Sequence, residues 1–316
     1  MQGIKILSVA GCHPSKKVTN DDMSKIVETD DEWISTRTGI HSRYFCQGDE
    51  SCVSMSIDAA NAAITLSGIS KDEISCVICA TISGDYATPS VACMVQKALN
   101  LPEDIPVLDV NAACSGFIYA LCVARGLLEG SDKKYGLVIG MEQLSKLLDM
   151  TDRTTCVLFG DGGGAVVIER DEKALFRQVL GARGGMEISC LGTGYDKSYV
   201  KMDGKAVFRF AVWAMPKCID DLLAIEDGND IKLSDIDHVV CHQANSRIID
   251  HVVKKSKQDP KKFYKNLDHF GNTSSGSIPL ALSELYEDGR LKKGDKLILV
   301  GFGSGLTWGG VMIEFG

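Results

Sequence analysis

The stretch Val110-Asn111-Ala112-Ala113-Cys114-Ser115-Gly116-Phe117 lies where a predicted strand turns into a predicted helix. Residues 105–110 have strand composition, and apolar residues recur at helical spacing over 117–128, before Gly130. Cys114 therefore lies among small residues at a helix N-terminus, where unpaired N–H groups and the helix dipole favour the thiolate. A structural cysteine is the alternative in so apolar a setting. Its position makes Cys114 a candidate nucleophile.

Length and composition narrow the possible classes. The chain has 316 residues, 45% hydrophobic and 24% charged, with a formal net charge of -8. It can form a large core in one unit or in two intimate halves. The acidic balance argues against nucleic acid as the main partner. No apolar run reaches membrane-spanning length, so no membrane partner is expected, and residues 1–7 resemble a first strand and not a signal peptide.

The cysteines indicate a reducing compartment. Twelve are scattered through apolar segments of a long chain, which favours a cytoplasmic protein over a disulfide framework. Cys76 and Cys79 form a CxxC, but alternation along the predicted strand sends their side chains to opposite faces. No second CxxC occurs, so we expect no metal site.

Three matches predict an internal repeat. Ile74, Val77, Ile78 and Cys79 match Ile236, Val239, Val240 and Cys241 at an offset of 162. Ser115-Gly116-x-Ile118 matches Ser275-Gly276-x-Ile278, and Leu137-Val138-Ile139 matches Leu297-Ile298-Leu299, both at an offset of 160. Alternating strands and helices with buried apolar strands indicate mostly parallel sheets covered by helices. We expect two α/β halves, residues 1–170 and 171–316, whose corresponding loops meet at one interface.

Local patterns predict several further elements. Strands are expected over 4–10, 74–82 and 135–141, and a helix over 51–67. Residues 29–32 have capping-box spacing before a short helix over 33–37. Thr88-Pro89 suits the first positions of a helix that runs to about residue 99. A tight turn over 159–164 leads into a strand over 165–169.

The repeat brings three chemically useful residues together. His242 follows the strand that ends at Cys241, and Asn272 lies in a glycine-rich loop that corresponds to the Cys114 loop. Separately, His242 would be read as a satisfied half-buried histidine and Asn272 as a turn residue. Together, at corresponding strand ends, Cys114, His242 and Asn272 favour a catalytic site.

On these residues the chain resembles the β-ketoacyl-acyl-carrier-protein synthase III family of thiolase-like synthases. The resemblance is nearly full length. Its motifs are Thr29-Asp30-Asp31-Glu32-Trp33-Ile34-Ser35-Thr36-Arg37-Thr38-Gly39-Ile40, Asn111-Ala112-Ala113-Cys114-Ser115-Gly116, His242-Gln243-Ala244-Asn245, Gly271-Asn272-Thr273-Ser274 and Gly301-Phe302-Gly303-Ser304-Gly305-Leu306-Thr307-Trp308-Gly309. It implies a homodimer of α/β subunits, each a thiolase-like five-layered αβαβα sandwich of two pseudo-repeats.

The resemblance implies a two-step acyl transfer that starts type II fatty acid synthesis. Cys114 takes an acyl group from acyl-CoA, and malonyl-acyl-carrier protein then loses CO₂ and attacks the acyl group. Neutral donors on His242 and Asn272 would stabilise the enolate oxyanion, and the backbone N–H groups of Cys114 and Ser304 would form the oxyanion hole for acyl transfer. Ser304 departs from the usual glycine. No cofactor is implied, because coenzyme A enters as the substrate thioester.

The resemblance also implies binding residues. Trp33 would stack on the CoA adenine, Arg37 and Arg153 would lie near its phosphates, and Thr29, Gly204 and Asn245 would contact the adenine or the pantetheine arm. Core packing for Trp33 and solvated positions for the arginines are the alternatives, and Lys205 departs from the usual uncharged residue. Phe302 and Thr88 would line the acyl pocket, Thr88 from the dimer partner. A threonine there predicts starters longer or bulkier than acetyl, unless Thr88 is only a helix cap.

A local basic stretch is a candidate docking surface for the acidic carrier protein. Residues 247–265 hold seven basic side chains against two acidic ones, Asp250 and Asp259, for a balance of +5. The basic residues are Arg247, Lys254, Lys255, Lys257, Lys261, Lys262 and Lys265. A merely solvated charged face is the alternative.

Three rival functions fit the sequence less well. A thiolase-like condensing enzyme of a secondary-metabolite pathway would keep the same triad with another acceptor. A cysteine hydrolase can also use cysteine, histidine and asparagine in that order, but the papain-type cysteine signature is absent and Cys114 follows a strand in a duplicated unit. An intact set of site residues argues against a non-catalytic scaffold.

Overall fold

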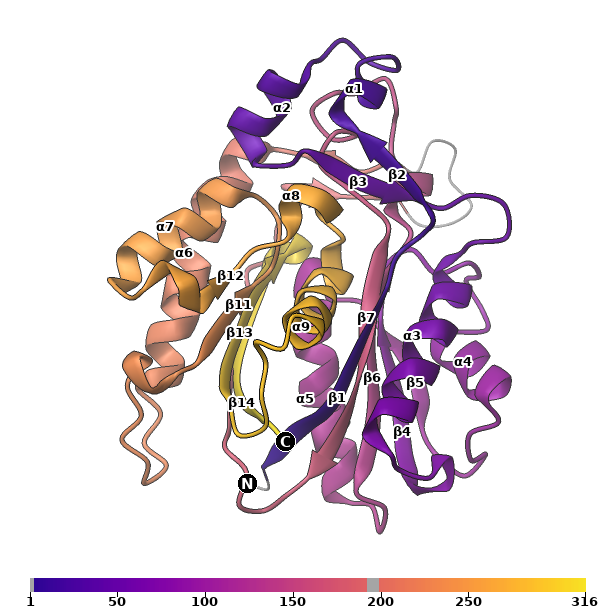
Figure 1. Cartoon of the computed structure of the whole chain (residues 1–316), viewed down its shortest axis with the longest axis vertical. Helices are drawn as coiled ribbons and strands as arrows, with labels where there is room; N and C mark the ends of the chain where they lie inside the picture. Colours follow the sequence, from indigo (N-terminus) through magenta and orange to yellow (C-terminus); the bar gives the residue numbers. More distant parts are fainter. Residues whose placement is uncertain (1–2, 192–198) are drawn as a thin grey trace.

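One sheet of ten strands organises the computed structural model, which describes residues 3–191 and 199–316 (Figure 1). Met1 and Gln2, part of the predicted first strand, lie outside these ranges. The ten strands are β1 (Ile4–Cys12), β4 (Ile74–Ala80), β5 (Val107–Val110), β6 (Tyr135–Glu142), β7 (Gly162–Arg170), β8 (Phe176–Ala182), β11 (His238–Cys241), β12 (Phe263–Tyr264), β13 (Lys296–Gly303) and β14 (Thr307–Phe315). Two small ribbons pair β2 (Lys16–Thr19) with β3 (Ser42–Phe45) and β9 (Ile188–Ser189) with β10 (Lys201–Met202). The helices are α1 (Asn20–Met23), α2 (Asp31–Thr38), α3 (Cys52–Ser67), α4 (Val91–Leu99), α5 (Gly116–Glu129), α6 (Gly204–Leu223), α7 (Ser246–Ser256), α8 (Leu267–Phe270) and α9 (Ser277–Glu287).

The strand order confirms the predicted pseudo-repeat. The first half runs β5-β4-β6-β7-β1 and the second runs β12-β11-β13-β14-β8, so each strand has a counterpart in the same place. A short parallel pairing of Lys5 and Ile6 with Glu314 and Phe315 joins the two. The offset between β6 and β13, and between the starts of α5 and α9, is 161. By place in the fold, Cys114 therefore corresponds to Ser275, one residue away from the predicted match of Ser115 with Ser275.

The sheet is mixed, whereas mostly parallel pairing was expected. Within each half, β4 or β11 is parallel to both of its neighbours. The other pairs, β6 with β7, β7 with β1, β13 with β14 and β14 with β8, are antiparallel. The expectation failed because no crossover helix separates β13 from β14, or β6 from β7, and such strands can return antiparallel.

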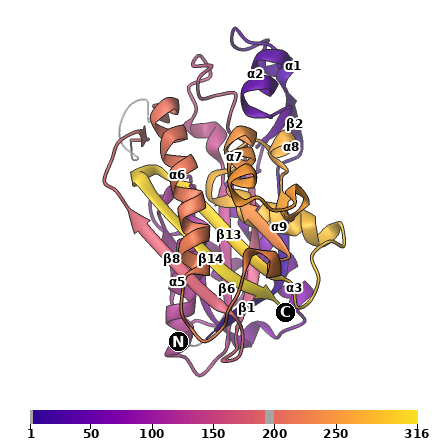
Figure 2. The same ribbon diagram turned by 90° about the vertical axis from the view of Figure 1, so that its left-hand side faces the viewer.

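The layers follow from the apolar faces. Helices α5 and α9 lie between the two halves of the sheet, where they share one apolar cluster with strands from both halves (Figures 1 and 2). Helices α3 and α4 cover one outer face and α6 and α7 the other (Figure 1). This is the expected αβαβα sandwich. Cys76 and Cys79, both fully buried, belong to different apolar clusters, as alternation predicts.

Two predicted helix caps are wrong by one or two residues. Asp30, and not Thr29, caps α2 by accepting the Trp33 N–H at 2.6 Å. Ser90 caps α4 by accepting the Cys93 N–H, so Thr88 lies before the helix and is exposed. The strand expected from residue 165 begins earlier, at Gly162. Among the helices of the described ranges, none is long and apolar enough to cross a membrane.

Candidate active site

Cys114 lies in the short turn η2 (Ala113–Ser115) between β5 and α5. Ala113 has a φ of 45°, and its N–H donates to Asn111 Oδ1 at 3.3 Å. Gly303 closes the turn from the other half, because a Cβ there would lie only 2.7 Å from the Cys114 amide nitrogen. A glycine is therefore required at 303 for Cys114 to occupy this place.

The environment of the thiol differs from the sequence-based expectation. Burial raises the pKa of the Cys114 thiol to about 12, although the Ser274 hydroxyl and the Cys114 N–H oppose this rise. The sequence predicted a lowered pKa from the helix N-terminus alone, and could not show that the second half encloses the thiol. At neutral pH the resting Cys114 is therefore a neutral thiol. Negative charge on its sulfur has to be stabilised while the reaction proceeds.

His242 is held directly after β11. Its backbone N–H donates to the Val300 carbonyl at 2.8 Å, and only 1% of the residue is exposed. Burial lowers the pKa of the imidazole to about 3, so it is neutral at physiological pH. The ring meets Phe302 edge to face, with 5.3 Å between centroids.

Ser277 is the hydrogen-bond partner of His242 Nδ1. The Ser277 Oγ lies 2.7 Å from His242 Nδ1 and also accepts the Gln243 N–H at 3.4 Å. A hydroxyl oxygen can accept from that amide and still donate its own proton to Nδ1. With Nδ1 as the acceptor, the imidazole proton lies on Nε2, where it makes a neutral donor.

Asn272 is fixed on both sides. Its backbone N–H donates to the Leu158 carbonyl at 2.9 Å and its carbonyl accepts the Gly160 N–H at 3.0 Å. Its side-chain Oδ1 accepts the Ser274 N–H at 2.8 Å. With the oxygen used in this way, the amide NH₂ is the end left to donate.

Cys114 and His242 both lie next to Gly301. A Cβ at Gly301 would be 3.5 Å from the His242 Cβ and 3.7 Å from the Cys114 carbonyl oxygen. The turn η6 (Ser274–Gly276), which follows Asn272, contacts the Cys114 turn. The segments that carry one nucleophile and two uncharged donors therefore meet, an arrangement that suits chemistry that builds an oxyanion.

Ser304 directs its side chain away from the thiol. Its hydroxyl donates to the Ile188 carbonyl at 2.5 Å, which ties the turn to β9. The Thr307 hydroxyl lies within hydrogen-bond distance of the carbonyls of Ser304 (2.9 Å) and Ala112 (3.1 Å). The departure from glycine thus adds an anchor and leaves the backbone N–H in place.

Trp33 is the centre of a separate cationic group at the top of the molecule. The guanidinium carbons of Arg37 and Arg153 lie 4.7 Å and 5.1 Å from the centroid of its ring. Asn245 Nδ2 donates to the Arg37 carbonyl at 3.1 Å, so α7 joins this group. Thr29 Oγ1 is buried, and among the described residues it has no hydrogen-bond partner. An aromatic face, two guanidinium groups and an unsatisfied hydroxyl are features that fit a nucleotide.

The comparisons with known proteins agree along the whole chain. The family models 3-oxoacyl-[acyl-carrier-protein] synthase III and its C-terminal counterpart match residues 108–184 and 227–315. A beta-ketoacyl-[acyl-carrier-protein] synthase III from Clostridium tetani is 42% identical, with 99% of this chain and 98% of the relative covered. One from Clostridium novyi is 43% identical over 100% of both chains.

The chain belongs to the 3-oxoacyl-[acyl-carrier-protein] synthase III family.

Solved structures of this family share the fold. The synthase III structure from Aquifex aeolicus has a TM-score of 0.91 and 38% identity, covering 99% of this chain and 100% of the other. The priming beta-ketosynthase of the R1128 polyketide pathway also has a TM-score of 0.91, at 28% identity, covering 99% and 96%. Family membership confirms the predicted enzyme class and disfavours the hydrolase and the scaffold.

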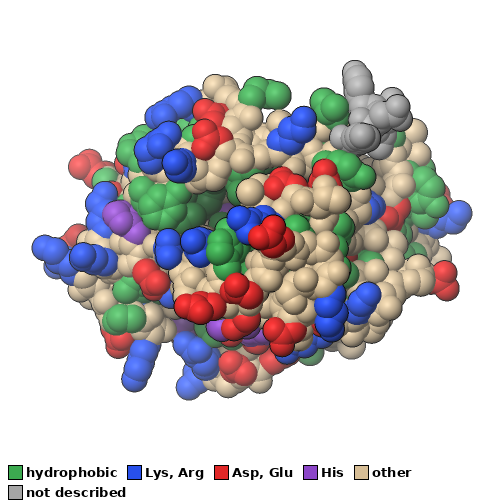
Figure 3. Space-filling view, turned by 90° about the horizontal axis from the view of Figure 1, so that it is seen from above, with side chains coloured by type: hydrophobic (Ala, Val, Ile, Leu, Met, Phe, Trp, Pro, Cys, Tyr) green, Lys and Arg blue, Asp and Glu red, His purple; other side chains and the backbone are tan. Residues whose placement is uncertain are grey.

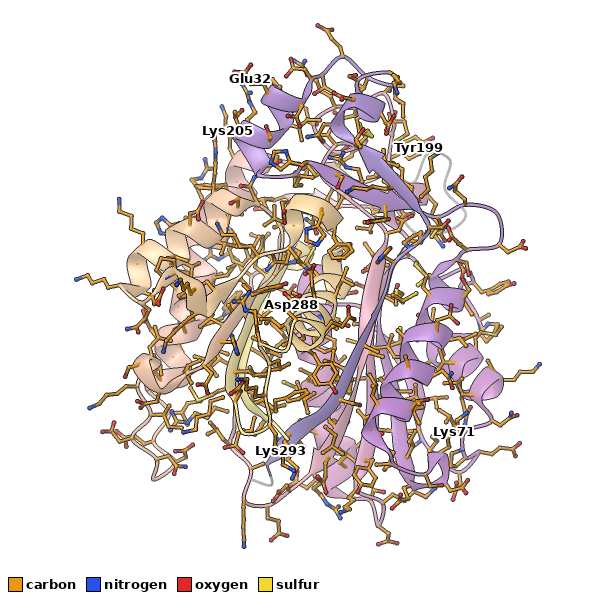
Figure 4. All side chains as sticks on the ribbon, in the orientation of Figure 1. Glu32, Lys71, Tyr199, Lys205, Asp288 and Lys293 are labelled. Carbon is orange, nitrogen blue, oxygen red and sulfur yellow. The ribbon has the colours of Figure 1, made fainter. Side chains whose placement is uncertain are left out.

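The predicted acyl-pocket residues lie in different settings. Phe302 is 2% exposed beside the His242 ring. Thr88 is exposed in the loop before α4 and is not among the residues that enclose Cys114 in this single chain. Gly204 begins α6, and the Lys205 side chain projects outward beside it (Figure 4).

Several cations of the basic stretch have polar partners, and Arg247 Nη2 donates to the Thr36 carbonyl at 2.7 Å. Lys262 Nζ donates to the carbonyls of Ser234 and Ile236 at 2.7 Å, and Lys265 pairs with Asp250 at 2.5 Å. Four residues of α7 and its C-terminal cap remain exposed: Arg247, Lys254, Lys255 and Lys257. Figure 3 shows Lys and Arg side chains gathered on this side of the upper face, around hydrophobic side chains and a hollow.

Several residues of the site were not predicted. Gly303, Thr307, Ser274 and Ser277 all lie inside quoted or neighbouring motifs, but their contacts join separate segments. Only the internal repeat could have drawn attention to Ser275 and its surroundings. Within the described ranges, no group of three or more His, Cys, Asp and Glu residues is arranged to hold a metal ion.

Proposed function

We propose that this chain starts type II fatty acid synthesis by joining the acyl group of an acyl-CoA to malonyl-acyl-carrier protein, with loss of CO₂. The product is a β-ketoacyl-carrier protein. The observation that supports the proposal is that the segments of Cys114 and neutral His242 meet at Gly301, with the turn that follows Asn272 against the Cys114 turn.

In the first half-reaction, Cys114 exchanges its proton for an acyl group. The sulfur attacks the thioester carbonyl, and the backbone N–H groups of Cys114 and Ser304 receive the oxyanion of the tetrahedral intermediate. The C–S bond to coenzyme A then breaks. The proton lost by Cys114 leaves with the coenzyme A thiol, so the exchange is balanced.

In the second half-reaction, malonyl-carrier protein loses CO₂ and becomes an enolate. The Nε2–H of His242 and the Nδ2–H of Asn272 stabilise the oxyanion, since neither carries a charge that must be neutralised first. The enolate carbon attacks the acyl carbonyl, the bond to Cys114 breaks, and uptake of one proton restores the thiol. Each oxyanion donor is expected to contribute about 3–4 kcal/mol to lowering this barrier.

The assembly that suits this reaction is a homodimer. β5 is the edge strand of the first half, and Leu108 on it is 36% exposed. An edge with unpaired backbone groups is covered when a second copy pairs with it. Thr88 of each copy would then line the acyl pocket of its partner, with room for starters longer than acetyl. Because all twelve cysteines are free, we expect the enzyme to work in the reducing cytoplasm.

Intact-protein mass spectrometry tests the proposal. Incubation with a mixed acyl-CoA pool should add one acyl mass to wild-type protein, and none to a Cys114→Ala variant. Malonyl-carrier protein should then remove that mass and appear as the β-ketoacyl form. Rapid release of free acid without malonyl-carrier protein would instead indicate a hydrolase.

A second test concerns carrier docking. The double change Lys254→Glu and Lys255→Glu should raise the KM for malonyl-carrier protein about tenfold at low salt with little change in kcat, because exposed charges mainly steer encounter. Lys293→Glu is the control, since Lys293 lies at the lower end of the molecule, away from α7 (Figure 4). Equal effects of the two changes would argue against docking at α7.

A further inference from the structure

Glu142, the last residue of β6, is a fully buried acid that the proposed mechanism does not use. Its Oε2 accepts hydrogen bonds from the Thr81 hydroxyl (3.1 Å), the Ile82 N–H (3.1 Å) and the Ser83 hydroxyl (2.5 Å). Its Oε1 lies 2.9 Å from Ser275 Oγ. In the part of the chain that the structure describes, no Lys, Arg or His forms an ion pair with it.

Burial without a cationic partner favours a neutral acid at this site. Ser275 Oγ lies near two acceptors, the Ala80 carbonyl at 2.8 Å and Glu142 Oε1. If Oε1 carries a proton, Glu142 donates to Ser275, Ser275 donates to Ala80, and Oε2 keeps its three donors. This arrangement satisfies the polar atoms and leaves no unpaired charge in a buried site.

The internal repeat shows which residue of the second half occupies the place that Glu142 occupies in the first half. Gly303 ends β13 as Glu142 ends β6, and Ser275 occupies the place in the second half that Cys114 occupies in the first. Ala113 and Ser274, the preceding residues, have φ values of 45° and 49°. At the reactive end, glycine lets the backbone of the Cys114 turn pack directly against β13. At the other end, the Glu142 side chain contacts the Ser275 hydroxyl.

The filled site is continuous with the reactive one. Ser275 directly follows Ser274, whose N–H donates to Asn272 Oδ1, and both serines belong to the turn η6 (Ser274–Gly276), which contacts the Cys114 turn. The hydrogen bond between Ser275 and Glu142 therefore anchors the turn over 272–275 from behind. On the other side, Glu142 holds Thr81 to Ser83 at the end of β4.

We propose that Glu142 is a positioning residue, held as a neutral carboxylic acid that donates to Ser275 and thereby fixes the 272–275 turn for condensation. The role rests on the proposed function, because it concerns the geometry of its second half-reaction.

Two electrostatic observations support the neutral state. Burial raises the pKa of Glu142, and its hydrogen-bond donors lower it only in part. The titratable groups that feel Glu142 are the thiols of Cys52, Cys79 and Cys114, and a negative charge on Glu142 would raise the pKa of each. A carboxylate would therefore oppose the charge that develops during catalysis, whereas a neutral acid does not.

The decisive comparison is between Glu142→Gln and Glu142→Ala, with Ser275→Ala as a second way to break the contact. Glutamine reproduces the neutral acid, since its NH₂ donates to Ser275 and its oxygen accepts from residues 81–83. We expect Glu142→Gln to condense within about threefold of wild type. Glu142→Ala and Ser275→Ala should lose about 100-fold in condensation, as when one oxyanion donor is displaced, while acylation of Cys114 changes less than about tenfold. The matched control is Glu169→Gln, because Glu169 lies on β7 in a partly exposed ion pair with Lys5 of β1.

A direct readout accompanies the kinetics. The infrared difference spectrum of wild type minus Glu142→Gln should contain the carbonyl band of a protonated carboxylic acid, and bands of a carboxylate alone would overturn the proposal. It is also overturned if Glu142→Gln is as slow as Glu142→Ala, or if Ser275→Ala slows both half-reactions equally. Failure of the proposed function would appear instead in the wild type, which would form no β-ketoacyl product, and the infrared result would still decide the state of Glu142.

Discussion

Replacing Ser277 with alanine should slow condensation and spare acylation. The Ser277 hydroxyl lies 2.7 Å from His242 Nδ1 and keeps the imidazole proton on Nε2. His242 is 1% exposed, so water cannot take the place of the lost hydroxyl. Leaving a buried polar group unsatisfied costs about 1–3 kcal/mol. If about 2 kcal/mol of preference for the productive tautomer is lost, the rate falls about 30-fold.

The assay is a single turnover. Enzyme acylated on Cys114 is mixed with saturating malonyl-carrier protein, and CO₂ release is followed beside acylation by acyl-CoA. Ser283→Ala is the matched control, because Ser283 is also buried on α9 and also makes two hydrogen bonds, with the Gly11 N–H at 2.7 Å and Glu287 at 2.8 Å. The assignment of the tautomer to Ser277 is refuted if Ser277→Ala condenses at the wild-type rate. It is also refuted if Ser283→Ala slows condensation as much as Ser277→Ala does.

Three further outcomes are expected. Gly303→Ala should slow acylation more than about tenfold, since its methyl group would lie 2.7 Å from the Cys114 nitrogen and overpacking costs about 1–3 kcal/mol; intact mass against time measures this. Hydrogen bonds to Asp268 and Glu284 raise the pKa of His269 to about 9, so its stabilising contribution is complete below about pH 6.5 and is lost as pH rises through about 9. The unfolding temperature should fall over that range, and a His269→Gln variant should show a smaller fall. Thr88→Phe should reduce acylation by long acyl-CoA more than by acetyl-CoA, whereas a sharp optimum at two carbons in wild type would contradict a spacious pocket.

The architecture could be predicted because similar strand-forming residues recur in both halves of the sequence. The matches at Val77 and Val239, and at Leu137 and Leu297, lie in counterpart strands of the two halves. Whether neighbouring strands pair in parallel or antiparallel was harder to predict, because the direction depends on the connection between the strands and not on their composition. Helix starts failed at Thr29 and Thr88 because several neighbouring residues can cap, and the geometry of one side chain decides which does.

Some features of the candidate site could likewise be predicted from the sequence, and others could not. Cys114 and His242 each follow a strand, β5 and β11, so their approximate meeting could be expected from the repeat. The raised pKa of Cys114 could not, because it arises from segments far away in the chain that exclude water. The contacts of Ser277 and Glu142 likewise join residues 35 to 133 positions apart, and no local pattern marks them.

The two guanidinium groups at Trp33 have a consequence for ligand discrimination. Arg37 and Arg153 both lie over the indole in the free chain, so a purine that stacked there would compete with them. A bare base would exchange one stacking partner for another and gain little affinity. A ligand that also carries phosphate groups would offer a displaced cation a new counter-ion. We therefore expect the indole to bind mainly molecules that bring their own negative charge.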